Sequence, residues 1–135
     1  MDGSMNELSA YRFDCCLEAL EDARLMYDHG RYKNCLNRAY YSIFHAMRAV
    51  NALDDFDSSK HSGVIAHFNQ HHVKTGDFPK EAAKIIRLAS EQREFADYRD
   101  FYIASKEEAF DQIQRAVDFC DAVRAYLTDR GIISK

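Results

Sequence analysis

Four polar side chains recur at helical spacing in the segment NRAYYSIFHAMR, residues 37–48: Arg38, Tyr41, His45 and Arg48. At about 100° per residue, these four positions fall on one side of a helix. Arg38 and His45 are seven residues apart, which corresponds to nearly two turns and about 10.5 Å along the axis. Two long side chains at that separation can converge on one small group that lies between them.

An arginine and a histidine placed in this way can act on a phosphodiester. The imidazole exchanges a proton near neutral pH, and the guanidinium stabilises negative charge on phosphate through its forked donors. Such a pair would cleave RNA without a metal ion, using the ribose 2′-OH as nucleophile, whereas DNA lacks this hydroxyl and would resist. We therefore assign Arg38 and His45 as candidate catalytic residues. Tyr41, Ser42 and Arg48 are candidate substrate-binding residues.

The distribution of charge around this segment favours an anion site. Residues 29–53 contain no Asp or Glu but four Arg or Lys residues, so the rest of the chain must carry −8 to give the net charge of −4. This asymmetry favours binding of an anion, phosphate above all, on an otherwise acidic protein. The acidic total is not typical of a protein that binds nucleic acid over a broad basic surface.

The polar stripe also has two structural explanations. Every amphipathic helix has a polar side, and Arg and Tyr are common there. Tyr and Arg are also enriched in the cores of protein interfaces. If two subunits paired through this side of the helix, their two stripes would meet and form one shared cleft.

Apolar periodicity predicts five helices, over about residues 6–29, 32–53, 60–73, from 79 into the nineties, and from 105 onward. Gly30 and Gly76 fit the ends of helices, and Ser105 with Glu108 is typical of a capping box. The fold class is therefore all-α: an up-and-down bundle of four long helices plus one short helix. We expect these residues in its core: Leu20, Ile43, Met47, Ile86, Ile113 and Val117.

The length of 135 residues fits one domain. Residues 1–5 are interpreted as an expression remnant, residues 6–130 as a single helical domain and residues 131–135 as a C-terminal tail. No apolar run is long enough to cross a bilayer, so no membrane association is expected. The four cysteines form no CxxC pair. We expect them to be reduced and packed as small apolar residues, in keeping with a cytoplasmic location.

Another group of polar residues occurs in the segment REFADY. Arg93 and Asp97 are four residues apart, which favours an ion pair on one helix face. Tyr98 then packs its ring and bonds through its hydroxyl. The functional alternative is that all three line the same cleft as the stripe, and they are included among the candidate substrate-binding residues.

Histidines in the 60–73 helix raise the question of a metal site. His67 and His71 are four residues apart, a spacing that can bind zinc on one helix face. The Glu of an HExxH pattern is missing and no Cys lies nearby in the sequence, so we predict neither a metal site nor a cofactor. His61 is expected to face the 32–53 helix and to form a hydrogen bond across the bundle.

Three stretches of the sequence, YKNCLNRAYYSIFHAMRAV, KHSGVIAHF and REFADY, resemble the small bacterial and archaeal HEPN-domain proteins of a largely uncharacterised branch. The resemblance covers about Phe13 to Leu127, and RAYYSIFHA and ADY are its most specific parts. It implies a helical up-and-down bundle with a fifth short helix, usually paired as a homodimer.

The resemblance also implies a choice of activities. Many HEPN proteins are metal-independent ribonucleases that place an R-x(4–6)-H motif in a cleft at the dimer interface. Many are encoded with a minimal nucleotidyltransferase that acts as antitoxin, and others bind nucleotides or serve as non-catalytic helpers. Arg38 and His45, with six residues between them, match the upper end of the motif.

In the well-studied toxins the motif lies late in the chain, whereas here it lies in the second helix, where it also fits a packing signature. The resemblance therefore implies a toxin-like ribonuclease or, alternatively, a nucleotide-binding or protein-interaction module paired with a nucleotidyltransferase.

Overall fold

A computed structural model of the chain describes residues 2–134, and these form helices and connecting loops without any strand. The four long helices are α1 (Asp2–Asp28), α2 (Tyr32–Ala52), α4 (Lys80–Tyr98) and α5 (Lys106–Asp129). The short helix α3 (His61–Phe68) continues directly into a π-helical turn, η1 (Asn69–Val73). The all-α class and the count of four long helices and one short one are confirmed.

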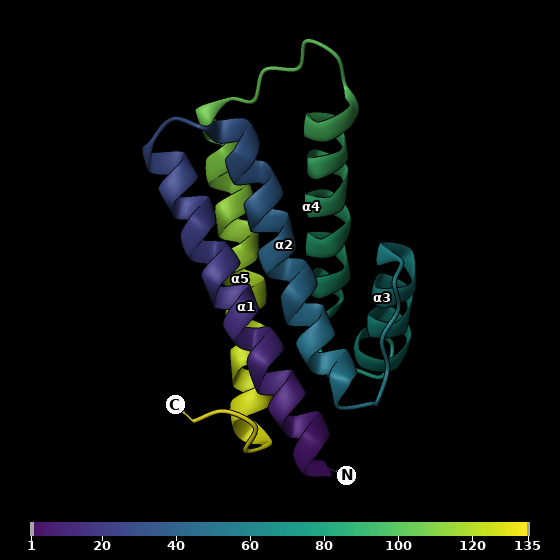
Figure 1. Cartoon of the computed structure of the whole chain (residues 1–135). Coiled ribbons are helices and arrows are strands. Elements are labelled where there is room, and N and C mark those ends of the chain that lie inside the picture. Colours follow the sequence, from purple (N-terminus) through teal and green to yellow (C-terminus); the bar gives the residue numbers. More distant parts are fainter. Residues whose placement is uncertain (1, 135) are drawn as a thin grey trace.

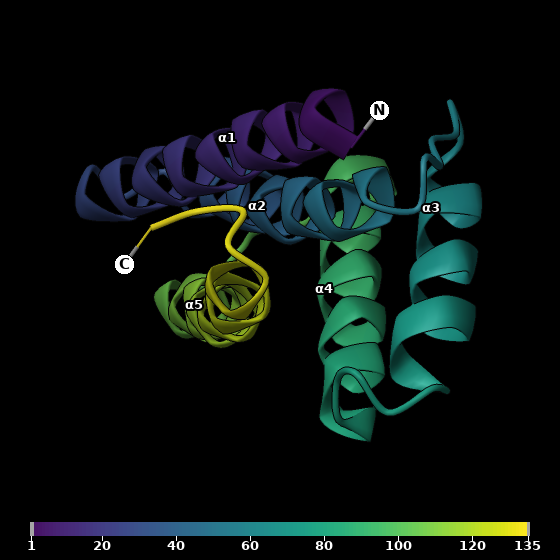
Figure 2. The same cartoon turned by 90° about the horizontal axis from the view of Figure 1, so that it is seen from below.

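Helix α2 is the centre of the bundle and packs against α1, α3, α4 and α5. Helices α1 and α4 run toward one end of the molecule, while α2 and α5 run toward the other (Figure 1). Seen from below, α3 and α4 lie side by side, across the bundle from α1 (Figure 2). Because α2 is covered on several sides, 13 of its 21 residues are buried, so only a narrow strip of α2 reaches solvent.

The helix ends follow the local signals in the sequence. Gly30 and Gly76 adopt φ values of 74° and 92°, which residues with a Cβ atom rarely adopt. At the start of α5, the Ser105 hydroxyl accepts a hydrogen bond from the Glu108 amide at 3.0 Å, and the Ser105 amide donates to the Glu108 carboxylate at 2.9 Å. The predicted capping box is therefore confirmed.

Two helix boundaries differ from the prediction. Helix α1 begins at Asp2 and so runs without a break through residues 2–5. The expected helix over 60–73 changes after Phe68 from α-helical to π-helical hydrogen bonding, and the Lys74 amide bonds to the Asn69 carbonyl at 2.9 Å. Met1 and Lys135, at the ends of the predicted remnant and tail, lie outside the described residues.

Four of the six predicted core residues are buried: Leu20, Ile43, Met47 and Ile86. Ile113 and Val117 are only half-buried, so their assignment to the core is wrong. Helix α5 instead turns the neighbouring Gln112 inward, fully buried, and its side-chain amide donates to the Ala89 carbonyl at 2.9 Å. A polar residue in this position escaped the prediction because an apolar stripe is defined by apolar residues alone.

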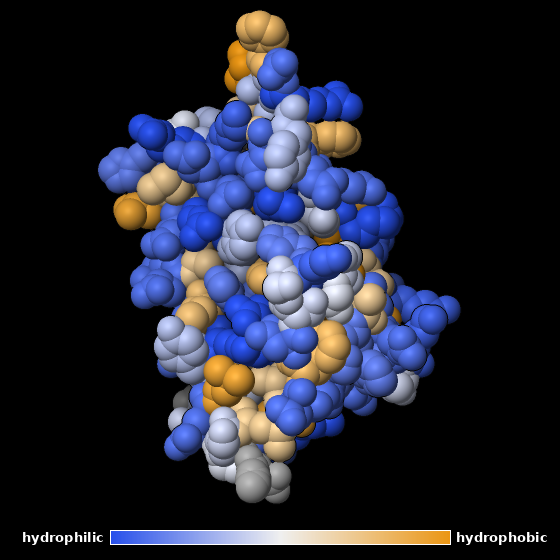
Figure 3. Space-filling view, turned by 45° about the vertical axis from the view of Figure 1, so that its right-hand side comes forward, coloured by the Kyte–Doolittle hydropathy of each residue, from blue (hydrophilic) through white to orange (hydrophobic). Residues whose placement is uncertain are grey.

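The surface seen over α3 and α4 is mostly hydrophilic, with hydrophobic side chains in scattered spots and at the tip of the loop between α4 and α5 (Figure 3). In that loop Phe101 and Ile103 are 100% and 88% exposed. All four cysteines are free, as predicted, and three of them are buried. Among residues 2–134, no helix combines the length and apolarity needed to cross a membrane.

Candidate functional site

The polar stripe of α2 is continuous in three dimensions. The guanidinium carbon of Arg38 lies 5.1 Å from the centroid of the Tyr41 ring, and the Tyr41 and His45 rings are 6.2 Å apart. Arg38, Tyr41, His45 and Arg48 are each half-buried. Tyr41 therefore lies between the two predicted catalytic residues, and all four side chains keep part of their surface open to solvent.

The electrostatic environment of His45 keeps its imidazole neutral. Burial lowers its pKa below the ordinary value of 6.5, and the positive charges of Arg48, Arg38 and Arg12 lower it further. A lowered pKa means that the unprotonated ring predominates at pH 7. His45 can therefore accept a proton, and the positive charges of three guanidinium groups act on its ring.

One of these three groups, Arg12, comes from α1 and was not identified from the sequence. It is only 8% exposed, and its guanidinium donates to Asp57 Oδ2 at 3.1 Å and to the Arg48 carbonyl at 3.3 Å. A signal was present, because Arg12 lies between Ser9 and Cys16 on the stripe that α1 buries. A charged residue at such a position needs a partner or a function.

Asp57, in the loop after α2, holds Arg48 in a two-pronged ion pair. Arg48 Nε lies 3.2 Å from Asp57 Oδ1, and Nη2 lies 2.9 Å from Oδ2. The hydrogen bond from Arg48 is the main reason why the pKa of Asp57 lies below its usual value. Since Arg12 and Arg48 share this one carboxylate, the group retains a net positive charge beside His45.

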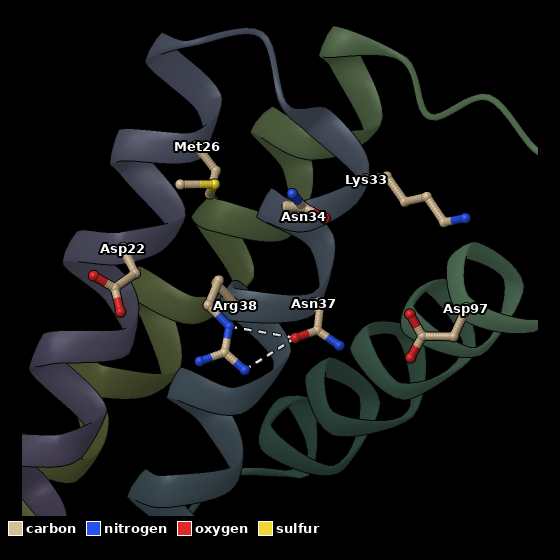
Figure 4. Close-up of a pocket in the computed structure, with 7 residues that line it drawn as sticks. All are labelled: Asp22, Met26, Lys33, Asn34, Asn37, Arg38 and Asp97. Carbon is tan, nitrogen blue, oxygen red and sulfur yellow. Dashed lines mark hydrogen bonds between the residues drawn. The ribbon is translucent and has the colours of Figure 1, made fainter.

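Arg38, at one end of the stripe, lines a hollow of about 370 Å³ (Figure 4). Its Nε and Nη2 donate to the Asn37 side-chain oxygen at 3.3 and 3.0 Å. The hollow is lined by residues from α1, α2 and α4: Asp22, Met26, Lys33, Asn34, Asn37, Arg38 and Asp97. It thus combines two cationic side chains and two amides with two carboxylates.

A second hollow, of about 460 Å³, lies at the opposite end of the stripe and includes Arg48, Phe44 and His61 in its lining. The Tyr40 hydroxyl lies 3.1 Å from His61 Nδ1, and the Phe44 and His61 rings are 4.2 Å apart. The predicted hydrogen bond of His61 to the 32–53 helix is therefore confirmed. His45 lines neither of these two hollows, so neither of them encloses the predicted catalytic pair.

The Arg93–Asp97 ion pair has an N–O distance of 3.1 Å, as the spacing predicted. The Arg93 guanidinium also lies 4.7 Å from the centroid of the Tyr40 ring, and its Nε is buried without a hydrogen-bond partner among the described residues. Asp97 shares the hollow of Arg38. Arg93 lies 5.9 Å from the centroid of the Tyr41 ring, so Arg93 and Asp97 border the stripe. Tyr98, in contrast, is 76% exposed and lines neither hollow.

Ser42 corrects the predicted substrate-binding set. Its side chain is completely buried, and its hydroxyl donates to the Cys16 carbonyl at 2.9 Å and lies 3.2 Å from Cys120 Sγ. Ser42 sits beside the stripe in sequence but faces the junction of α1 and α5. It is shielded from any ligand on the surface, so its assignment as a substrate contact is wrong.

Comparisons with known proteins agree with this architecture. Residues 13–126 match the family model described as the HEPN domain. A UPF0332 protein of Thermotoga maritima is 36% identical over 112 residues, covering 83% of this chain and 85% of the relative. Two proteins of Methanocaldococcus jannaschii are also similar: "Putative toxin MJ0605" at 30% identity, covering 83% of each chain, and "Putative toxin MJ0142" at 28%, covering 86% of this chain and 79% of the relative.

Proposed function

The chain belongs to the HEPN-domain family, and from this premise we propose that it is a toxin-like, metal-independent endoribonuclease in which Arg38 and His45 act on the RNA backbone. The observation that carries the proposal is the half-buried position of His45 on the same stripe as Arg38 and Arg48, where burial and the charges of Arg48, Arg38 and Arg12 lower its pKa. A base next to fixed positive charge suits attack on a phosphodiester. The names of the two archaeal relatives support a toxin-like role.

The reaction follows from these groups. A ring nitrogen of His45 accepts the proton of the ribose 2′-OH, and the 2′-oxygen forms a bond to phosphorus as the bond from phosphorus to the 5′-oxygen breaks. Arg38 donates hydrogen bonds to the non-bridging oxygens, where negative charge increases in the transition state. The products are a 2′,3′-cyclic phosphate and a 5′-hydroxyl.

The leaving 5′-oxygen needs a proton from a second source. In-line attack places this oxygen on the far side of phosphorus from the attacking 2′-oxygen, where the same imidazole cannot reach it and where water can supply the proton. A homodimer paired through the α2 stripes would place a second set of polar side chains on that side. The solvent-exposed side of the stripe would then form a cleft between the two copies, and Tyr41 and Arg48 would hold the strand along it.

The test is incubation of purified protein with a mixed-sequence RNA in the presence of EDTA. We expect fragments with 2′,3′-cyclic phosphate ends, no cleavage of DNA of the same sequence, and a loss of about 100-fold or more in rate for His45→Gln. His71→Gln, which changes a histidine outside the stripe, is the matched control. Absence of cleavage by the unaltered protein, or an equal rate for His45→Gln, refutes the proposal.

A second candidate function is nucleotide binding without catalysis, in a complex with a minimal nucleotidyltransferase. The specific observation in its favour is the hollow of Arg38, in which Lys33, Asn34 and Asn37 add a second cation and two amides. These groups can bind a phosphate and the edge of a base. Two results together would support this function instead of the first: saturable nucleotide binding that Lys33→Gln weakens, and no cleavage of RNA by the unaltered protein.

A further inference from the structure

Three side chains at the end of the molecule where α2 is followed by α3 bring their ligand atoms together. Asp54 Oδ2 lies 2.9 Å from His67 Nε2 and 2.6 Å from His72 Nε2. All three atoms lie within 4.8 Å of one another. None of the three residues belongs to the α2 stripe, so a role for this cluster is independent of the ribonuclease proposal.

The π-helical turn is the reason that His67 and His72 face the same carboxylate. In a regular α-helix, residues five apart differ in direction by about 140°. A π-helical turn closes its hydrogen bonds between residues five apart, and such turns are frequent at functional sites. The turn begins at Asn69, between the two histidines. The sequence spacing of four had suggested His67 with His71, and the structure instead pairs His67 with His72.

The ring of His72 is oriented by a second carboxylate. Its Nδ1 lies 3.2 Å from Asp77 Oδ2 while its Nε2 faces Asp54, and the side chain is only 4% exposed. A neutral imidazole has one N–H and can donate to only one of two carboxylates. Both contacts are satisfied when a cation lies between Nε2 and Asp54 and the one N–H, at Nδ1, donates to Asp77. Metal-binding histidines usually donate their other N–H to a carboxylate, which is the place of Asp77 here.

The ring of His67 is held by stacking. Phe56 lies nearly parallel to it, with ring centroids 3.9 Å apart and planes at 10°, and His71 stacks on it at 4.2 Å. The nearly parallel contact with Phe56 restricts rotation of the His67 ring and keeps Nε2 directed at Asp54. Ligand atoms that are fixed before binding lose little conformational freedom when an ion arrives.

We propose that Asp54, His67 and His72 bind one divalent transition-metal ion, of which Zn²⁺ is the best match. Two imidazoles and one carboxylate are ligands that Zn²⁺ accepts, at bonds of about 2.0–2.2 Å. A tetrahedral ion separates its ligand atoms by about 3.3 Å, so the two nitrogen–oxygen distances must widen by about half an ångström. A water molecule would complete the coordination.

The charges at this position are compatible with a dication. Asp54 and Asp77 bring two carboxylates to His72, and the charge of a divalent ion balances that of two carboxylates. One oxygen of the Asp54 carboxylate lies within hydrogen-bond distance of both His67 and His72, so the carboxylate is already directed at the position of the ion. The ion would tie the end of α2 to α3 and η1, and would stabilise that end of the bundle.

The experiment uses the untagged full chain, treated with EDTA and then dialysed, and measures Zn²⁺ binding by calorimetry. We expect one ion per chain and a higher temperature of unfolding in Zn²⁺. His67→Gln should weaken binding by more than about 100-fold, since it removes a direct ligand. His71→Gln, which removes a neighbouring imidazole that is not a ligand, should bind like the unaltered protein.

Two further measurements keep the result decisive. Asp54→Asn tests the carboxylate, and its circular dichroism without metal shows whether the fold is intact. The visible absorption of bound Co²⁺ reports a tetrahedral nitrogen and oxygen environment, distinct from that of cysteine sulfur. No saturable binding by the unaltered protein, or binding that His67→Gln leaves unchanged, overturns the proposal.

Discussion

Two histidine regions of this molecule differ in the sign of the charges that surround them. On the α2 stripe, burial lowers the pKa of His45, and the positive charges of three arginines lower it further. After α2, His67 and His72 both face the carboxylate of Asp54. Positive neighbours keep an imidazole free of a proton and ready to accept one. Negative neighbours favour a bound cation.

The comparison shows that the same side chain is prepared for two kinds of chemistry by its tertiary neighbours. Around His45, Arg12 and Arg48 share one carboxylate, so an approaching anion finds unbalanced positive charge. Around His72, two aspartates share one buried imidazole, so an approaching cation finds negative charge. Single substitutions in the two regions test this difference, from the largest expected effect to the smallest.

Arg38→Ala, in the α2 stripe, should reduce the rate of RNA cleavage and give the largest effect of these substitutions. Loss of one donor to the transition-state charge typically reduces the rate by about 10²–10³-fold. RNA cleavage in EDTA measures this effect. The rate for Arg38→Lys should lie between those of Arg38→Ala and the unaltered protein, because lysine keeps the positive charge but lacks the forked N–H donors of the guanidinium. Arg87→Ala, an exposed arginine of α4, is the control, and an equal loss in that variant would show that general charge is what matters.

Asp77→Asn should weaken Zn²⁺ binding by about 10–100-fold without abolishing it. The amide still contacts His72, but it orients the ring less strongly than a carboxylate does. Calorimetry with Zn²⁺ gives the affinity, and thermal unfolding without metal checks that the fold is retained. If metal affinity stays the same in Asp77→Asn, Asp77 is not a positioning residue for the site.

Arg48→Gln should shift the pH dependence of RNA cleavage. Arg48 lowers the pKa of His45, so its removal raises that pKa, and the imidazole then becomes protonated and inactive at a higher pH than before. The acid limb of log kcat/KM should therefore move to higher pH by a fraction of a unit, with a greater loss at pH 6 than at pH 8. An unchanged acid limb would mean that another group, not His45, accepts the proton.

His71→Gln should have the smallest effect in both regions. His71 is exposed and stacks on His67 without facing Asp54 or the stripe. We expect its free energy of unfolding to change by no more than about 0.5 kcal/mol, with RNA cleavage and Zn²⁺ affinity near those of the unaltered protein. A large loss of metal affinity would identify His71 as a ligand and redefine the cation site.

Much of the fold could be predicted because helix periodicity is local. The α2 residues Leu36, Tyr40, Ile43, Met47 and Val50 are all fully buried, as their spacing indicates. The capping box at Ser105 depends only on residues within one turn, and it was equally predictable. Ile113 and Val117 were placed wrongly because the packing of α2 against α5 decides which residues of the apolar stripe of α5 are buried most deeply.

The candidate sites were less predictable because each joins separate elements. Spacing within α2 grouped Arg38, Tyr41 and His45 correctly, yet it could not show that Ser42 faces α1 and α5. Asp57 and Arg12 lie 45 residues apart in the chain and meet beside Arg48. No local pattern encodes that contact.

The sequence by itself determined the helices, the buried stripe of α2 and the window of 25 residues without an acid, since these depend on residue type and on the helical period. Only the tertiary structure decided which charges surround each histidine. Coulomb interactions depend on distance through space, and the packing of α1 and of the loop after α2 sets those distances. The π-helical turn likewise set the direction of His72, because one change in hydrogen bonding rotates every later side chain of the helix.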